Sequence, residues 1–196
     1  MVEDDSQYGE SSSNAAEPVS SSSSPSNLYL VGPMGVGKTT VGKALAEALH
    51  LRFIDVDREI ELRAGADIPW IFDVEGEAGF RLRESRALED IALQSGQLVA
   101  TGGGIVLSAA NRQMIKDTGY CIYLKADLQQ LVHRIGRDKK RPLLQTGNPR
   151  EVLGKILEER EPLYMEVANC VVQTTSKPMK YVVREVIRLY RLHYNL

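Results

Sequence analysis

The segment from Gly32 to Thr39 has the residue types and the spacing that hold a polyphosphate. It reads GPMGVGKT, which matches the pattern G-x-x-x-x-G-K-[ST] in full, and it lies between the apolar run LYLV and a helical pattern that starts near Lys38. Glycines allow consecutive backbone N–H groups to point at one spot, and the start of the helix adds its positive end. We expect Lys38 to reach the outer phosphates and the Thr39 hydroxyl to ligate Mg²⁺. The alternative is a glycine-rich turn with a surface lysine.

Two carboxylates follow the second apolar run of the chain. Asp55 and Asp57 belong to the segment FIDVD, and side chains two positions apart on an extended segment point the same way. Phosphorylation of a hydroxyl needs one acid near the metal ion and one near the acceptor hydroxyl. The alternative is that both are loop acids, one of which caps the next helix.

Three glycines and a basic run come later in the sequence. Gly102, Gly103 and Gly104 follow the apolar run QLVAT, where they either let a ligand approach the backbone closely or form a flexible turn. The segment HRIGRDKKRPLL is rich in Arg and Lys. It fits a solvated surface, a nucleic-acid patch, or a mobile lid that carries an arginine onto a triphosphate and excludes water.

The elements that must position these residues alternate along the chain. Strands are predicted at residues 28–31, 52–55, 97–101, 120–124 and 169–173, with helical patterns between them. This alternation predicts an α/β fold in which a parallel sheet is covered by helices on both faces. Ligands of such sheets bind at the carboxyl ends of the strands, which is where the acids and the glycines lie.

The composition predicts one folded domain and an N-terminal tail. The 196 residues, 43% of them hydrophobic, are enough for one well-buried core. Residues 1–26 are rich in Ser and acids and contain no Lys or Arg, so we predict a disordered tail rather than a signal or transit peptide. From residue 27 onward, 24 basic residues face 21 acidic ones, too weak an excess to indicate nucleic-acid binding.

Two further features bear on where the chain works. No apolar run approaches the ~18 residues that a membrane-spanning helix needs. Cys121 and Cys170 lie inside apolar runs without metal-type spacing, which fits buried thiols in a reducing compartment. We therefore expect a cytoplasmic protein without a membrane or nucleic-acid partner.

Taken together, six segments resemble the shikimate kinase family of small P-loop kinases. In chain order they are LVGPMGVGKTT, FIDVDREIE, IFDVEGEAGFRLRE, ATGGGIV, RDKKRPLL and EEREPLY. The resemblance covers essentially residues 27 to 190. It implies a P-loop NTPase-type three-layer sandwich with strand order 2-3-1-4-5, a single kinase domain over residues 27–196, and a mobile lid at about residues 134–150. It also implies Mg²⁺-dependent transfer of the γ-phosphate of ATP to the 3-hydroxyl of shikimate.

On the nucleotide side, the resemblance implies that Lys38 holds the phosphates, Thr39 ligates Mg²⁺, and Asp55 supports the water shell of the metal. Arg141 of the lid would stabilise the transferring phosphoryl group. Arg134 would stack near the adenine, with Lys177 and Pro178 on its other side. The complete set expected to contact ATP is Gly35, Val36, Gly37, Lys38, Thr39, Thr40, Arg134, Arg141 and Lys177. The position of Thr40 one place after the motif also fits a helix residue that only packs nearby.

On the acceptor side, the resemblance implies that Asp57 binds the shikimate hydroxyls and serves as base or orienting group. Arg81 and Arg160 would clamp the carboxylate, and the backbone of Gly102 to Gly104 would line the same pocket. A planar guanidinium matches a carboxylate in a bidentate fork, which supports this assignment independently.

The two arginines also have plain structural interpretations. Arg81 could be the i,i+3 partner of Glu84 on a surface helix, and Arg160 a cation at a helix end before Pro162. Glu84 itself is expected to hold Arg81 or the pocket wall in place.

Three other functions are weaker alternatives. A related kinase acting on gluconate would share the P-loop and the first acid, but the FRxRE, TGGG and KRPLL segments disfavour it. A nucleotide kinase would need more arginines around a second phosphate group. An idle nucleotide-binding module would have lost Asp57, Arg81 and Arg160, which are all present. The prediction is a monomeric kinase that binds ATP and shikimate.

Overall fold

The structure is a computed structural model that describes residues 26–135 and 148–195. Its centre is a five-stranded sheet in the order β2-β3-β1-β4-β5, with every neighbouring pair parallel. The strands are β1 (Asn27–Val31), β2 (Arg52–Asp55), β3 (Gln97–Ala100), β4 (Gly119–Lys125) and β5 (Cys170–Gln173). The parallel sheet and the strand order are confirmed, and each strand lies within about two residues of its predicted bounds.

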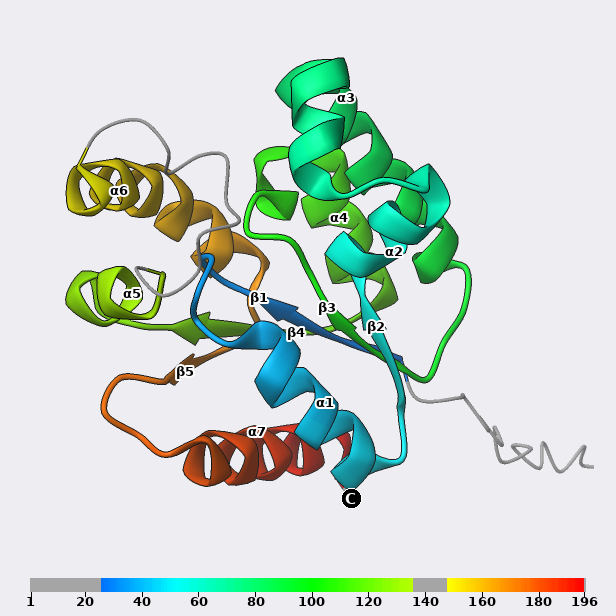
Figure 1. Cartoon of the computed structure of the whole chain (residues 1–196). Coiled ribbons are helices and arrows are strands. Elements are labelled where there is room, and N and C mark those ends of the chain that lie inside the picture. Colours follow the sequence, from blue (N-terminus) through cyan, green and yellow to red (C-terminus); the bar gives the residue numbers. More distant parts are fainter. Residues whose placement is uncertain (1–25, 136–147, 196) are drawn as a thin grey trace, which may run out of the picture.

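Helices cover both faces of this sheet (Figure 1). They are α1 (Lys38–Leu49), α2 (Val56–Ala64), α3 (Ile68–Ala92), α4 (Ala109–Thr118), α5 (Leu128–Ile135), α6 (Pro149–Val167) and α7 (Met179–Tyr194), with a short 3-10 helix η1 at Ile105–Leu107. The three-layer arrangement predicted from the sequence is therefore confirmed.

The hydrophobic core is divided by the sheet into two halves. Successive side chains of a strand point to opposite faces, so Leu28 and Leu30 of β1 pack with α1 and α7, whereas Tyr29 and Val31 pack with α2, α3, α4 and α6. All four side chains are fully buried. A strand buried on both faces appears in the sequence as a continuous apolar run, which is why LYLV was recognisable.

The parallel pairing places the carboxyl ends of the strands at one edge. Asp55 at the end of β2 is level with Ala100 of β3, and Ala100 is level with Leu30 of β1. At this edge lie the phosphate-loop segment after β1, Asp55 at the end of β2 with Asp57 at the start of α2, and the three glycines after β3. No helix in the described part of the chain is long and apolar enough to cross a membrane.

Candidate active site

The loop between β1 and α1 has the backbone of a phosphate cradle. Gly32 has a φ of 142°, and Gly37, which precedes the first residue of α1, has a φ of 103°. Residues with a Cβ rarely adopt such values. A Cβ at Gly32 would also lie 2.4 Å from the carbonyl oxygen of Leu124. Both glycines are therefore required by the shape of the loop, which leads into the positive end of a twelve-residue helix.

Lys38 is held against this loop. Its ammonium donates hydrogen bonds to the carbonyl oxygens of Gly32 at 2.7 Å and Pro33 at 2.9 Å, and the residue is only 8% exposed. The positive charge is thus fixed beside the N–H groups of the cradle.

Thr39 and Asp55 meet beside the loop. The Thr39 hydroxyl donates to Asp55 Oδ2 at 2.7 Å, while Asp55 Oδ1 accepts from the backbone N–H of Arg58 at 3.3 Å and caps α2. Asp55 therefore both caps a helix, as the alternative interpretation supposed, and lies next to Thr39. The pair offers two oxygens of the kind that Mg²⁺ prefers.

Asp57 is positioned by a helix and not by an extended segment as expected. The chain is not extended there, because α2 begins at Val56 and Asp57 lies in its first turn. The expectation of two acids on one extended segment was therefore wrong. A Cβ built on Gly102 would lie 2.7 Å from Asp57 Oδ1 and 2.5 Å from Glu84 Oε1, so both carboxylates adjoin the glycine loop after β3.

Glu84 and Arg81 form an ion pair at the same loop. Arg81 Nη1 donates to Glu84 Oε2 at 2.6 Å, and Arg81 also contacts Glu77. Its guanidinium lies so close to Gly104 that a Cβ there would meet it at 2.2 Å. The i,i+3 pairing anticipated from the sequence is present. However, Glu84 is 1% exposed and lies against the glycine loop rather than on the surface.

Burial dominates the electrostatics of this pair. Burial raises the pKa of Glu84 to about 7, because desolvation of the carboxylate outweighs the attraction of Arg81, and Asp57 adds repulsion. For Arg81, burial opposes the charged form, but the attraction of Glu84 and Glu77 together outweighs it and raises the pKa. Glu84 Oε1 has no hydrogen-bond partner among the described residues.

Arg160 enters the cluster from α6. The helix continues through Pro162 to Val167, so Arg160 is not at a helix end and that alternative interpretation is wrong. Arg160 is 6% exposed, its Nη1 donates to the Gly103 carbonyl at 3.4 Å, and its buried Nε has no partner among the described residues. A buried unpaired donor is rare in native proteins, and this one is free to bind an acceptor atom brought by a ligand.

Tyr164, which the sequence analysis did not single out, contacts the same carbonyl. Its hydroxyl donates to Gly103 O from one helical turn beyond Arg160. The only signal in the sequence is the i,i+4 spacing to Arg160, which places both side chains on one face of a helix.

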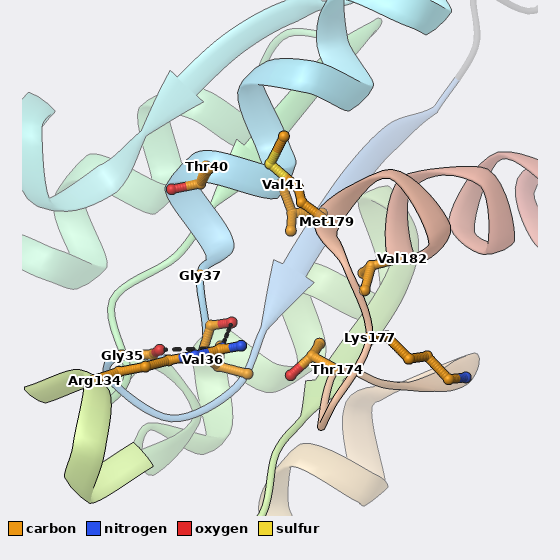
Figure 2. Close-up of a pocket in the computed structure, with 10 residues that line it drawn as sticks. All are labelled: Gly35, Val36, Gly37, Thr40, Val41, Arg134, Thr174, Lys177, Met179 and Val182. Atoms are coloured by element: carbon orange, nitrogen blue, oxygen red, sulfur yellow. Dashed lines mark hydrogen bonds between the residues drawn. The ribbon is translucent and has the colours of Figure 1, made fainter. Parts of the chain in front are cut away.

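A pocket of about 300 Å³ adjoins the other side of the phosphate loop. Arg134 donates to the carbonyls of Val36 at 2.9 Å and Gly35 at 3.5 Å, and Figure 2 shows it lying along the loop, whereas Lys177 points away from the loop in this view. The lining residues are Gly35, Val36, Gly37, Thr40, Val41, Arg134, Thr174, Lys177, Met179 and Val182. Of these, Val41, Thr174, Met179 and Val182 were not anticipated.

Part of the predicted site lies outside the described residues. Arg141 and most of the proposed lid belong to residues 136–147, so their contribution stays a prediction.

Two compartments thus share one edge of the sheet. The glycine loop with its acids and arginines adjoins the phosphate loop, since a Cβ on Gly103 would lie 3.3 Å from the backbone nitrogen of Met34. A phosphate loop beside a second cluster of acids and arginines is the arrangement of P-loop kinases that act on small molecules.

Comparison with known proteins narrows this class to one family. The family model for shikimate kinase matches residues 34–191, so the chain belongs to the shikimate kinase family. A shikimate kinase of Vibrio parahaemolyticus is 51% identical over 163 residues, which are 83% of this chain and 95% of that protein.

Solved structures agree with this result. A shikimate kinase from Acinetobacter baumannii, solved in complex with shikimate, superimposes with a TM-score of 0.82 at 45% identity and covers 84% of this chain and 92% of its own. A gluconokinase from Sinorhizobium meliloti, at 18% identity and a TM-score of 0.53 over 87% of this chain and 96% of its own, shares the fold alone.

Proposed function

We propose that this protein transfers the γ-phosphate of ATP to the 3-hydroxyl of shikimate, giving shikimate 3-phosphate and ADP in the biosynthesis of aromatic amino acids. The observation that carries the proposal is the convergence of Arg81, Arg160 and Asp57 on the glycine loop beside the phosphate cradle. Membership of the family and the shikimate-bound relative support it.

The acceptor carboxylate is assigned to the two arginines. They come from α3 and α6, and both contact the Gly102–Gly104 loop. The orphan Nε of Arg160 supplies a charged donor that a carboxylate would satisfy. Each charged hydrogen bond of this kind contributes roughly 1.5–3 kcal/mol, so an acceptor without a carboxylate would bind far more weakly.

Asp57 is assigned to the acceptor hydroxyl. Its carboxylate lies against Gly102, in the same loop whose Gly103 adjoins the phosphate loop and whose Gly104 adjoins Arg81. There it would accept a hydrogen bond from the hydroxyl that attacks, and either orient it or take its proton as the new O–P bond forms.

The donor side is assigned to the phosphate loop, with Lys38 holding the outer phosphates. Thr39 and Asp55 fit Mg²⁺, because a hydroxyl and a carboxylate oxygen lie together at the start of α1, and such ions bind through few protein oxygens plus phosphates and waters. The bound ion would supply charge neutralisation for the transferring phosphates. Arg134 and Lys177 are assigned to the nucleotide base and Arg141 to the transferring phosphoryl group.

We propose that a monomer is the active unit in the cytoplasm. The substrates are then the only partners that the reaction requires.

The test is ATP consumption by the purified protein with Mg²⁺, compared between shikimate, gluconate and no acceptor. Turnover with shikimate at least a hundredfold above both other reactions is the expected result. Equal rates with gluconate would assign the pocket to a broader class of hydroxy acids. A shikimate rate no higher than the rate without acceptor would overturn the proposal.

A further inference from the structure

The Gly103 carbonyl is held by two donors from the same face of α6. Tyr164 is 1% exposed and donates its hydroxyl to this oxygen, whereas Arg160 approaches it at 3.4 Å, a long hydrogen bond. A phenol is protonated at neutral pH, and burial raises the pKa of Tyr164 further, so its hydroxyl remains a donor. Tyr164 is therefore the stronger of the two restraints on this oxygen.

Holding this oxygen restrains the whole acceptor loop. A peptide unit is planar, so fixing the Gly103 carbonyl also fixes the N–H of Gly104 on the opposite side of the unit. Three consecutive glycines otherwise have wide conformational freedom. The next residue, Gly104, is packed against the Arg81 guanidinium, so a rotation of this peptide would move the surface on which Arg81 rests.

Tyr164 also donates the hydrogen bond to the Gly103 carbonyl that Arg160 would otherwise have to supply alone. The carbonyl needs a donor in a buried setting, because an unpaired buried polar group is costly. Without the phenol, Arg160 would be the only side chain to supply that donor among the described residues. Its guanidinium would then be drawn toward the loop and away from a bound carboxylate.

We propose that Tyr164 is a positioning residue for the acceptor, which sets the Gly103–Gly104 peptide and keeps Arg160 available for the substrate carboxylate. This inference rests on the proposed function, since it names shikimate as the acceptor. It concerns a residue that touches the loop rather than the reacting atoms.

The molecule offers a matched control for this idea. Tyr123 of β4 stacks on Tyr164 with ring centroids 5.1 Å apart, and it too is fully buried. Its hydroxyl has no hydrogen-bond partner among the described residues. Tyr164→Phe and Tyr123→Phe therefore remove the same atom from the same stacked pair, but only the first removes a hydrogen bond to the loop.

The experiment measures steady-state kinetics of both variants with each substrate varied in turn. For Tyr164→Phe we expect the KM for shikimate to rise about tenfold, equivalent to about 1.4 kcal/mol. We expect kcat to stay within about threefold and the KM for ATP within about twofold, because the hydrogen bond lost does not involve the phosphate loop. Tyr123→Phe should leave all three constants within about twofold of the wild type.

The outcomes separate this inference from the proposed function. If the wild type does not phosphorylate shikimate, the proposed function fails first. If the wild type is active and the two variants have the same KM for shikimate, Tyr164 has no positioning role and only the inference fails. An equal rise in both KM values of Tyr164→Phe, accompanied by a lower melting temperature, would indicate general loosening and would also overturn it.

Discussion

At the residue scale, the two acids of the FIDVD segment are placed to do different work. Asp55 hydrogen-bonds to Thr39 and caps α2, whereas Asp57 lies in the first turn of that helix and adjoins Gly102. Their separation follows from the capping role of Asp55, which turns the chain into a helix directly after β2.

Asp57→Asn tests the acceptor role of the second acid. We expect kcat to fall by at least about 100-fold, because an amide cannot accept the proton and a positioned base contributes roughly 10²–10⁴-fold. Binding of ADP, measured by calorimetry, should stay within about threefold of the wild type. Asp67→Asn is the control, since Asp67 caps α3 through its side chain and asparagine caps equally well. Near-normal turnover of Asp57→Asn would remove Asp57 from the chemistry.

Glu84 makes stability depend on pH. The pKa of this carboxyl is raised to about 7 in the folded protein, above its unfolded value near 4.5, so the folded state binds more protons between these two values. The free energy of unfolding should therefore fall as pH rises from 4.5 to 7, by about 3 kcal/mol at most, since one pKa unit corresponds to ~1.4 kcal/mol.

Glu84→Gln isolates this contribution. The amide cannot ionise, so urea unfolding of the variant should show a smaller loss of stability over that pH range than the wild type. Parallel pH profiles for the two proteins would show that Glu84 is not the group responsible.

At the element scale, the proposed acceptor site is assembled from one loop and two helices that are far apart in the sequence. The loop after β3 provides the floor, α3 brings Arg81 with Glu84, and α6 brings Arg160 with Tyr164. A Cβ at Gly102 would meet the Glu84 and Asp57 carboxylates and a Cβ at Gly104 would meet the Arg81 guanidinium, which accounts for these two glycines.

Gly104→Ala tests this packing. The backbone at Gly104 has a φ of −102°, which alanine adopts without strain, but its Cβ would lie 2.2 Å from Arg81 Nη1. The flexible arginine should yield while the fold persists. We expect the KM for shikimate to rise at least about tenfold through loss of a charged hydrogen bond, with the KM for ATP little changed.

Gly154→Ala on α6 is the control for this substitution. Among the described residues its Cβ would meet only Leu128 Cδ2, at 3.6 Å, an ordinary contact, so the kinetic constants should be unaffected. Equal constants for the wild type and Gly104→Ala would show that Arg81 does not need its observed position.

At the scale of the whole molecule, the sheet was predictable because a strand buried on both faces appears as a short apolar run. The strand order came from the family resemblance rather than from the residues themselves. Near the site, local patterns were ambiguous. A strand-end acid and a helix-capping acid look alike in sequence, so the turn of helix at Asp57 was missed.

The contribution of α6 was only partly predictable for a physical reason. Proline in a helix interior costs a hydrogen bond, so Pro162 suggested a helix end. In the structure, α6 packs Leu153, Tyr164 and Val167 into buried positions and continues past the proline. Only a continuous helix places Tyr164 one turn beyond Arg160, and its contact with Gly103 could not be inferred without that fact.

Removal of residues 1–25 tests the predicted division of the chain. The first strand begins at Asn27, and the family match begins at residue 34. We expect the shortened protein to keep kcat and both KM values within about twofold and its melting temperature within about 2 °C, because the composition of this segment predicts a disordered tail that adds nothing to the core. A large loss of either property would assign a role to the tail.

We propose above that the γ-phosphate of ATP moves to one hydroxyl of shikimate while Arg81 and Arg160 hold the shikimate carboxylate. The most direct test is ³¹P–¹H correlation NMR of the product formed from ATP and shikimate by the purified protein with Mg²⁺. We expect one phosphomonoester signal, coupled to the proton on carbon 3, that grows in step with ADP. Inorganic phosphate in place of this ester, or coupling to a proton on another carbon, would contradict it.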